Sequence, residues 1–165
     1  IEKEAIVDEI KSQFSFYWFH FLTCQLSWFK LWQSKLNDID LIFIAIQALI
    51  PSLKFSDSTK NLNIDNLHAA IGKTNPNYKS SKASINASSI SDISGIPRAT
   101  CIRKLEKLVQ LGFLVREIKS KRYFINQFAS SRSKYLMKKE YIFEGLEIYS
   151  NFLSIVINAI NRTKN

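Results

Sequence analysis

The chain has 165 residues, of which 46% are hydrophobic, so it is long enough to bury a core and is not a wholly disordered chain. Its net charge of +9 is concentrated in residues 98–139, which hold twelve basic and two acidic side chains, whereas the rest of the chain is close to neutral. Such a segment either attracts a polyanion, usually nucleic acid, or forms a solvated basic surface.

The cysteines and histidines of the chain are few and scattered. Two of each are present, and they match no metal-ligand spacing, so we expect neither a metal nor another cofactor. Cys24 and Cys101 lie inside apolar helical patterns, which is typical of small core residues in a reducing compartment. Because the N-terminal stretch also lacks the pattern of a secretion signal, the sequence predicts a cytoplasmic protein.

The first predicted element is a long helix over residues 2–36. Two apolar stripes run along it at steps of three and four, which indicates a helix buried on two sides. One side is expected to face its own domain, and the other a second subunit, a neighbouring helix or a ligand. The run 14–29 has no charged residue, but it is short for a membrane span, so no membrane partner is expected. Segment 1–36 is therefore predicted to be a packing and dimerisation helix, with its subunit contact at Trp18, Leu22, Phe29 and Trp32.

A second helix, rich in Leu, Ile and Phe, is predicted over residues 39–52, after a break at Asn37. The polar stretch 55–84 follows it. This stretch is predicted to hold one short helix, 64–71, and an exposed loop, 73–82.

Residues 85–125 carry the most informative pattern in the chain. Asn86 is suited to cap a short helix over residues 87–94, because its side chain can accept a hydrogen bond from the first turn. Gly95 then supplies the left-handed backbone that a tight corner between two helices often needs.

A second helix is predicted from Pro97 to residue 111, with Gly112 ending it. Its core face is expected to carry Cys101, Leu105, Leu108 and Val109. Two strands follow at 113–118 and 122–125, with residues 119–121 at the tip between them. The order is therefore helix, turn, helix and β-hairpin.

This segment resembles bacterial winged helix-turn-helix regulators of the MarR and IclR types. The string Gly95–Leu105 is similar to their turn and recognition helix, and the run Leu108–Leu114 to their helix end and first wing strand. The resemblance implies a DNA-binding domain over residues 39–128, in which helix 39–52 comes first and 55–84 is a polar insertion.

In these families, the second helix enters the major groove and the wing lies on the backbone or in the minor groove. The resemblance thus implies sequence-specific binding of double-stranded DNA, with helix 97–111 in the major groove and wing 113–125 beside it. Base contacts are implied for Arg98, Ala99, Thr100 and Arg103. Phosphate contacts are implied for Ser89, Ser91, Lys104 and Lys107, and wing contacts for Lys119, Lys121 and Arg122.

The last predicted element is a helix over residues 138–161. Its apolar residues form a heptad seam, which either packs on its own domain or meets a second copy. The MarR-type resemblance implies a two-fold dimer built by terminal helices. The seam consists of Ile142, Leu146, Tyr149, Leu153, Val156 and Ile160.

Taken together, these elements predict a mainly α-helical protein with a small β-wing, in which a winged helix-turn-helix is flanked by long N- and C-terminal helices. The expected function is that of a dimeric transcription regulator, and a small-molecule effector is left open. No phosphate-binding glycine loop and no nucleophile–base pair at an interpretable spacing is present, so we do not expect an enzyme. Two alternatives are a winged-helix module that binds an acidic protein partner and a replication-initiator-like DNA-binding protein.

Overall fold

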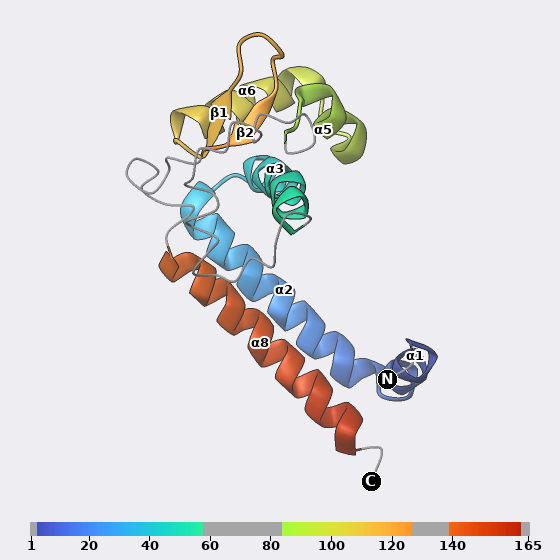
Figure 1. The fold of residues 1–165 in the computed structure, drawn as a ribbon. Helices are drawn as coiled ribbons and strands as arrows, with labels where there is room; N and C mark the ends of the chain where they lie inside the picture. The colour runs from blue at the N-terminus through green and yellow to red at the C-terminus, as the bar shows by residue number, and fades with distance from the viewer. Residues whose placement is uncertain (1–2, 58–83, 127–138, 163–165) are drawn as a thin grey trace. The chain divides into compact units, whose positions relative to one another are not determined.

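The computed structural model describes residues 3–57, 84–126 and 139–162 (Figure 1). As predicted, the protein is mainly helical with one small two-stranded antiparallel sheet. The helix predicted at 64–71 and the loop predicted at 73–82 lie outside the described residues. The described elements are α1 Lys3–Ser12, α2 Phe14–Leu36, α3 Ile39–Asp57, α5 Ala87–Ser94, α6 Arg98–Gln110, β1 Leu114–Arg116, β2 Tyr123–Ile125 and α8 Lys139–Arg162.

The chain divides into two compact units. Unit 1 contains Ile1–Ser34 and Lys139–Asn165, and therefore joins the two ends of the sequence. Unit 2 is the continuous segment Lys35–Lys138. It holds α3, α5, α6 and the hairpin, so all elements of the predicted DNA-binding segment that the structure describes belong to one unit.

In unit 1, the helix predicted over residues 2–36 is two helices, because the chain breaks at Gln13. The break falls in a polar run with no apolar side chain to hold it against a neighbour. The Glu9 carbonyl accepts both from the Ser12 hydroxyl at 2.8 Å and from the Gln13 N–H at 3.2 Å, so a side chain shares the acceptor with the helical backbone at the break. The prediction of one continuous helix was therefore wrong at this point.

Helices α2 and α8 lie side by side as an antiparallel pair within unit 1 (Figure 1). The rings of Phe21 and Phe152 are 6.2 Å apart, and Cys24 Sγ lies 4.0 Å from the Ile148 carbonyl oxygen. Farther along α2, Leu31 approaches Gly145. Residues with increasing numbers along α2 contact residues with decreasing numbers along α8, so the two helices are antiparallel.

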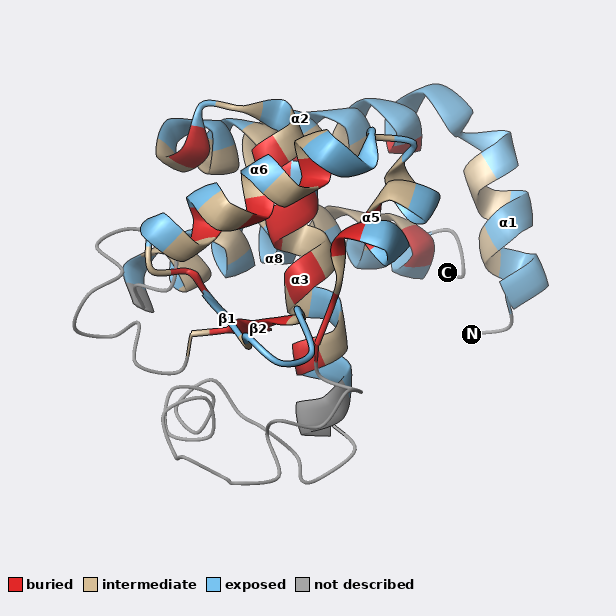
Figure 2. Ribbon diagram, turned by 90° about the horizontal axis from the view of Figure 1, so that it is seen from above, coloured by how far each residue is buried: buried red, intermediate tan, exposed pale blue. Residues whose placement is uncertain are grey.

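In unit 2, helix α3 packs against α5, α6 and β2, and α6 packs against β1. Figure 2 shows buried residues in red on α3, α6 and the hairpin. The core residues with the least exposure include Leu41, Ile44, Ile90, Cys101, Leu105, Leu108, Phe113 and Leu114. Helix α3 runs to Asp57, although the sequence predicted an end at residue 52 near Pro51. Pro51 removes one backbone hydrogen bond from the helix. Ser52, the next residue, is buried, so tertiary packing keeps the chain helical beyond the proline.

The two strands are shorter than predicted, and β2 is buried along its whole length. In the antiparallel register, Leu114 faces Ile125 and Arg116 faces Tyr123. The other edge of β2 is also paired, because Ile85 exchanges two backbone hydrogen bonds with Tyr123 at 3.0 and 2.9 Å. The segment that leads into α5 is thus tied to the hairpin, and β2 lies between two neighbours.

Candidate nucleic-acid interface

The corner between α5 and α6 is built from short-range hydrogen bonds. Asn86 Oδ1 accepts from the Ser89 N–H at 2.8 Å, and Gly95 has a φ of 71° and donates to the Ser91 carbonyl at 2.9 Å. The predicted cap and left-handed glycine are therefore confirmed. The Ser91 hydroxyl, for which a phosphate contact was predicted, donates to the Ile96 carbonyl at 2.7 Å and so stabilises the corner. The Ser89 side chain is exposed.

Helix α6 has one buried and one exposed face. Cys101, Leu105 and Leu108 are fully buried as predicted, whereas Val109 is half-buried. Cys101 Sγ donates to the Ile96 carbonyl at 3.4 Å, and burial raises the pKa of the Cys101 thiol. The exposed face, which we call the outer face, carries four residues at helical spacing: Ala99, Arg103, Lys107 and Gln110.

Arg98 lies at the first position of α6, beside α5. Its Nε donates to the Ser88 hydroxyl oxygen at 3.0 Å, and both side chains are exposed. Thr100 is half-buried. Of the four residues predicted to contact bases, three are therefore exposed. Ala99 and Arg103 lie on the outer face of α6, and Arg98 lies at the start of α6, next to α5. Sequence analysis did not identify Ser88 as a residue that positions Arg98.

Lys104 forms an internal ion pair with Asp38, and the two side chains are only 13% and 22% exposed. Asp38 also caps α3, because its Oδ1 accepts from the Leu41 N–H at 3.0 Å. Burial by itself would raise the pKa of Asp38, but the hydrogen bonds from Lys104 and Leu41 outweigh it, so that pKa lies below its usual value. Lys104, for which a phosphate contact was predicted, thus ties α6 to the start of α3. The pair borders an open hollow of about 480 Å³, whose other lining residues are Arg103, Glu106, Lys107 and Gln110.

Glu106 joins α6 to the end of the strands nearest the hairpin tip. Its Oε1 accepts from Arg116 at 2.8 Å and from the Tyr123 hydroxyl at 2.7 Å, and the Arg116 guanidinium lies 5.7 Å from the centre of the Tyr123 ring. Burial, and then the hydrogen bond to Glu106, raise the pKa of Tyr123 to about 12. One of the two acids in the basic segment is therefore neutralised by an arginine of the same segment, and the hairpin is fixed against α6.

The hairpin tip is closed by backbone and side-chain hydrogen bonds. The Glu117 N–H donates to the Arg122 carbonyl at 2.9 Å, and the Ser120 hydroxyl donates to the Glu117 carboxylate. Lys121 adopts a φ of 55°, which turns the chain back toward β2. Lys119 and Lys121 are exposed, so the tip presents two cations from an ordered loop.

Arg122 points back into unit 2. Its Nε donates to the Ser84 hydroxyl oxygen, and a second guanidinium nitrogen lies 3.3 Å from the Ser84 carbonyl oxygen. The side chain is half-buried. These contacts reinforce the pairing of the segment before α5 with β2. The DNA contact predicted for Arg122 stays a prediction.

The residues predicted for dimerisation divide into exposed and covered ones. Phe29, Trp32, Ile142 and Val156 are half-buried, and Ile160 is buried. Five others are 46–47% exposed and form what we call the apolar patch: Trp18, Leu22, Leu146, Tyr149 and Leu153. A second exposed apolar set on α2 consists of Phe16, Phe19 and Leu26.

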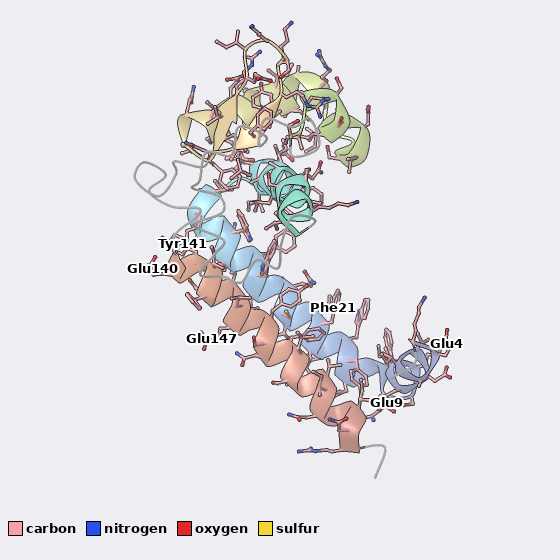
Figure 3. The ribbon with its side chains drawn as sticks, viewed as in Figure 1. Glu4, Glu9, Phe21, Glu140, Tyr141 and Glu147 are labelled. Atoms are coloured by element: carbon pink, nitrogen blue, oxygen red, sulfur yellow. The ribbon has the colours of Figure 1, made fainter. Side chains whose placement is uncertain are left out.

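The two halves of the apolar patch lie on the same side of the α2–α8 pair. Leu22 follows the contact residue Phe21 by one position, and Leu153 likewise follows Phe152. Each step along a right-handed helix rotates the side chain by about 100° in the same sense. In two antiparallel helices that pack against each other, the residues that come one position after the contact residues therefore point to the same side of the pair. Phe21 is labelled in Figure 3.

Comparison of the chain with protein family models, curated proteins and solved structures found no match. Among the described residues, no group of three or more His, Cys, Asp or Glu side chains is arranged to hold a metal ion. Within the same part of the chain, no single helix has the length and hydropathy to cross a membrane, although Phe14–Leu36 and Ile39–Lys54 meet that test when they are counted together.

Proposed function

We propose that the protein is a sequence-specific regulator of transcription that binds double-stranded DNA through a winged helix-turn-helix. In this proposal, α5 and α6 are the helix-turn-helix and the β1–β2 hairpin is the wing. The observation that carries it is the distribution of exposed cations in unit 2. Arg98 and Arg103 on α6 and Lys119 and Lys121 at the hairpin tip are exposed, whereas the nearby Glu106 is paired internally. In Figure 3, nitrogen-tipped side chains gather around the hairpin and α6.

The residue roles follow from exposure and side-chain chemistry. A guanidinium can donate two hydrogen bonds to guanine, so Arg98 and Arg103 are the proposed readers, and the methyl group of Ala99 suits contact with thymine. Lys107 on the outer face, with Lys119 and Lys121 on the wing, is proposed to contact phosphates. Lys104, Arg122 and Ser91 hold the domain together and are not proposed as DNA ligands.

The proposed regulator is a homodimer. The apolar patch draws on both helices of the α2–α8 pair and lies on one side of it, as expected of a surface that a second copy covers. Two copies joined in this way would form a four-helix arrangement. A two-fold dimer in turn implies a nearly palindromic site, with half-sites about one helical turn of DNA apart.

Binding to duplex DNA tests the proposal directly. A selection from random duplexes identifies the preferred site, and fluorescence anisotropy at several salt concentrations then measures affinity. We expect affinity to fall steeply with salt, because each phosphate contact contributes about 0.9 to the log–log slope. No binding at low salt would contradict the proposal. Binding to an acidic protein instead would favour the alternative of a protein-interaction module.

Single substitutions separate base reading from phosphate binding. Arg98→Ala or Arg103→Ala should weaken binding to the selected site by about 1–3 kcal/mol and relax preference at one base pair. Lys121→Ala should weaken selected and random duplexes alike and lower the salt slope by about one unit. If site preference changed only with Lys121→Ala, the wing would be the reader and these roles would be reversed.

We further propose a cytoplasmic protein without catalytic activity. The buried thiols of Cys24 and Cys101 suit a reducing compartment. The cations of α6 and the hairpin tip favour binding of a polyanion over bond-making chemistry. A small-molecule effector remains compatible with this proposal and would be detected as a change in DNA affinity.

A further inference from the structure

The apex of the hairpin carries a large apolar side chain in open solvent. Ile118 is 89% exposed, more than any other large hydrophobic residue in the described part of the chain. It is the first residue of the tip, and the exposed Lys119 and Lys121 follow it. An isoleucine so exposed contributes nothing to the core of unit 2, and its burial would release free energy when a partner covers it.

The tip that carries Ile118 is held in place on both sides. The Glu117 N–H donates to the Arg122 carbonyl at 2.9 Å directly below it, and the Ser120 hydroxyl bonds to the Glu117 carboxylate. The strands beneath are fixed in turn by Glu106 and by Ser84. Ile118 therefore projects from a preformed support, and little conformational entropy is lost when it binds.

The charges beside Ile118 indicate the chemistry of the partner. Lys119 and Lys121 add two positive charges and Glu117 adds one negative charge, so residues 117–121 carry a net charge of +1. The Glu117 carboxylate accepts a hydrogen bond from the Ser120 hydroxyl. An apolar side chain that is followed directly by two exposed cations fits a surface that has an apolar interior and negative edges. The minor groove of duplex DNA is such a surface, because stacked bases lie between two phosphate backbones.

We propose that Ile118 acts as a wedge that enters the minor groove and partly unstacks one base step, while Lys119 and Lys121 contact the flanking phosphates. This inference rests on the proposed DNA-binding function and adds a residue to it. Apolar wedges of this kind kink DNA by about 20–90° toward the major groove, and flexible pyrimidine–purine steps accept them most readily. Ile118 would thus favour such a step at the wing position without hydrogen bonding to a base.

The test uses the full chain and its selected duplex, in which a fluorescent adenine analogue replaces one adenine at a time. Emission of the analogue rises when it is unstacked. We expect a rise at one step under the wing with the unmodified chain. With Ile118→Ala we expect no rise, with binding weakened about tenfold or more because the buried side chain is lost. Ile118→Met, which keeps the apolar volume, should retain the rise.

Two matched variants make the result specific. Ile93→Ala removes an isoleucine that is 74% exposed on α5, away from the tip, and should leave the fluorescence unchanged. Lys119→Ala should lower the salt slope but keep the rise at saturation. Saturated binding with no rise at any step, or with the same rise for Ile118→Ala, would overturn the wedge and leave the DNA-binding function standing. Failure of the unmodified chain to bind any duplex at low salt would overturn both.

Discussion

At the scale of single residues, Glu106 shows how a basic segment can be made rigid without losing its positive charge. One carboxylate oxygen accepts from Arg116 and from Tyr123, so a single acid connects α6 with both strands of the hairpin. The exposed cations at Arg103, Lys107 and the hairpin tip are left available. The cost of burying the Tyr123 hydroxyl is offset by this hydrogen bond.

The raised pKa of Tyr123 predicts a loss of stability in alkali. The pKa of Tyr123 is about 12 in the folded chain and 10.0 without the fold. The protonated hydroxyl therefore contributes its full stabilisation below pH 10, and this stabilisation is lost as pH rises through 12. The loss should amount to about 3 kcal/mol in the free energy of unfolding. Urea denaturation across this pH range would measure it. Tyr123→Phe should cost about 1 kcal/mol at neutral pH but flatten the alkaline decline. An unchanged decline in Tyr123→Phe would refute the assignment.

Lys104 and Lys107 are close neighbours on α6 for which we expect different roles. Lys104→Met leaves Asp38 without its ammonium partner, so the free energy of unfolding should fall by about 1–3 kcal/mol, with little change in the salt slope of DNA binding. Lys107→Met, at an exposed position, should change stability by less than about 0.5 kcal/mol and lower that slope by about one unit. Thermal unfolding and anisotropy titrations of both variants test the pair. The reverse pattern would return Lys104 to the DNA interface.

At the scale of elements, Gly145 marks where α8 comes close to α2. A Cβ placed there would lie 3.7 Å from Leu31 Cδ2, which is an ordinary contact. Gly145→Ala should therefore fit and raise the free energy of unfolding by about 0.5–1 kcal/mol through its higher helix propensity. Gly145→Leu should lower it, because a larger side chain would overfill the contact. Urea denaturation would show both effects, and a destabilising Gly145→Ala would mean that the helices pack more tightly than described.

Elements whose signals are local in sequence were predicted well. The cap at Asn86, the corner at Gly95 and the helix end at Gly112 each depend on one residue type with a definite backbone preference, and the structure confirms them. The break at Gln13 and the passage of α3 through Pro51 were missed. Both depend on whether neighbouring segments bury the helix, which periodicity alone does not reveal.

The features of the candidate site that could not be predicted from the sequence are contacts between residues far apart in the chain. Lys104 and Asp38 are 66 positions apart, and Arg122 and Ser84 are 38 apart. A lysine in a basic helix has the same sequence signature whether it faces solvent or a buried carboxylate. Lys104 and Arg122 were therefore assigned to DNA on charge and family resemblance, and only the fold separated them from exposed cations such as Arg103.

At the scale of the whole molecule, the apolar patch leads to a prediction about assembly. Leu153→Asp places a charge in the patch and should yield monomers, whereas Ser154→Asp adds the same charge at the next position and should leave the dimer intact. Light scattering at micromolar concentration distinguishes the two states. A monomeric unmodified chain would contradict the proposed homodimer. DNA binding by Leu153→Asp should weaken, because one copy reaches only one half-site.

The placement of the two cysteines gives each unit its own chemical reporter. Cys24 lies in unit 1 and Cys101 in unit 2, and both thiols are buried and free. A thiolate must form and reach solvent before it can be alkylated, and burial raises the pKa of both groups. The rate at which each cysteine is alkylated therefore follows how often its own unit opens. With one thiol in each half of the molecule, peptide mapping after brief alkylation would time the opening of the two units separately, without any engineered label.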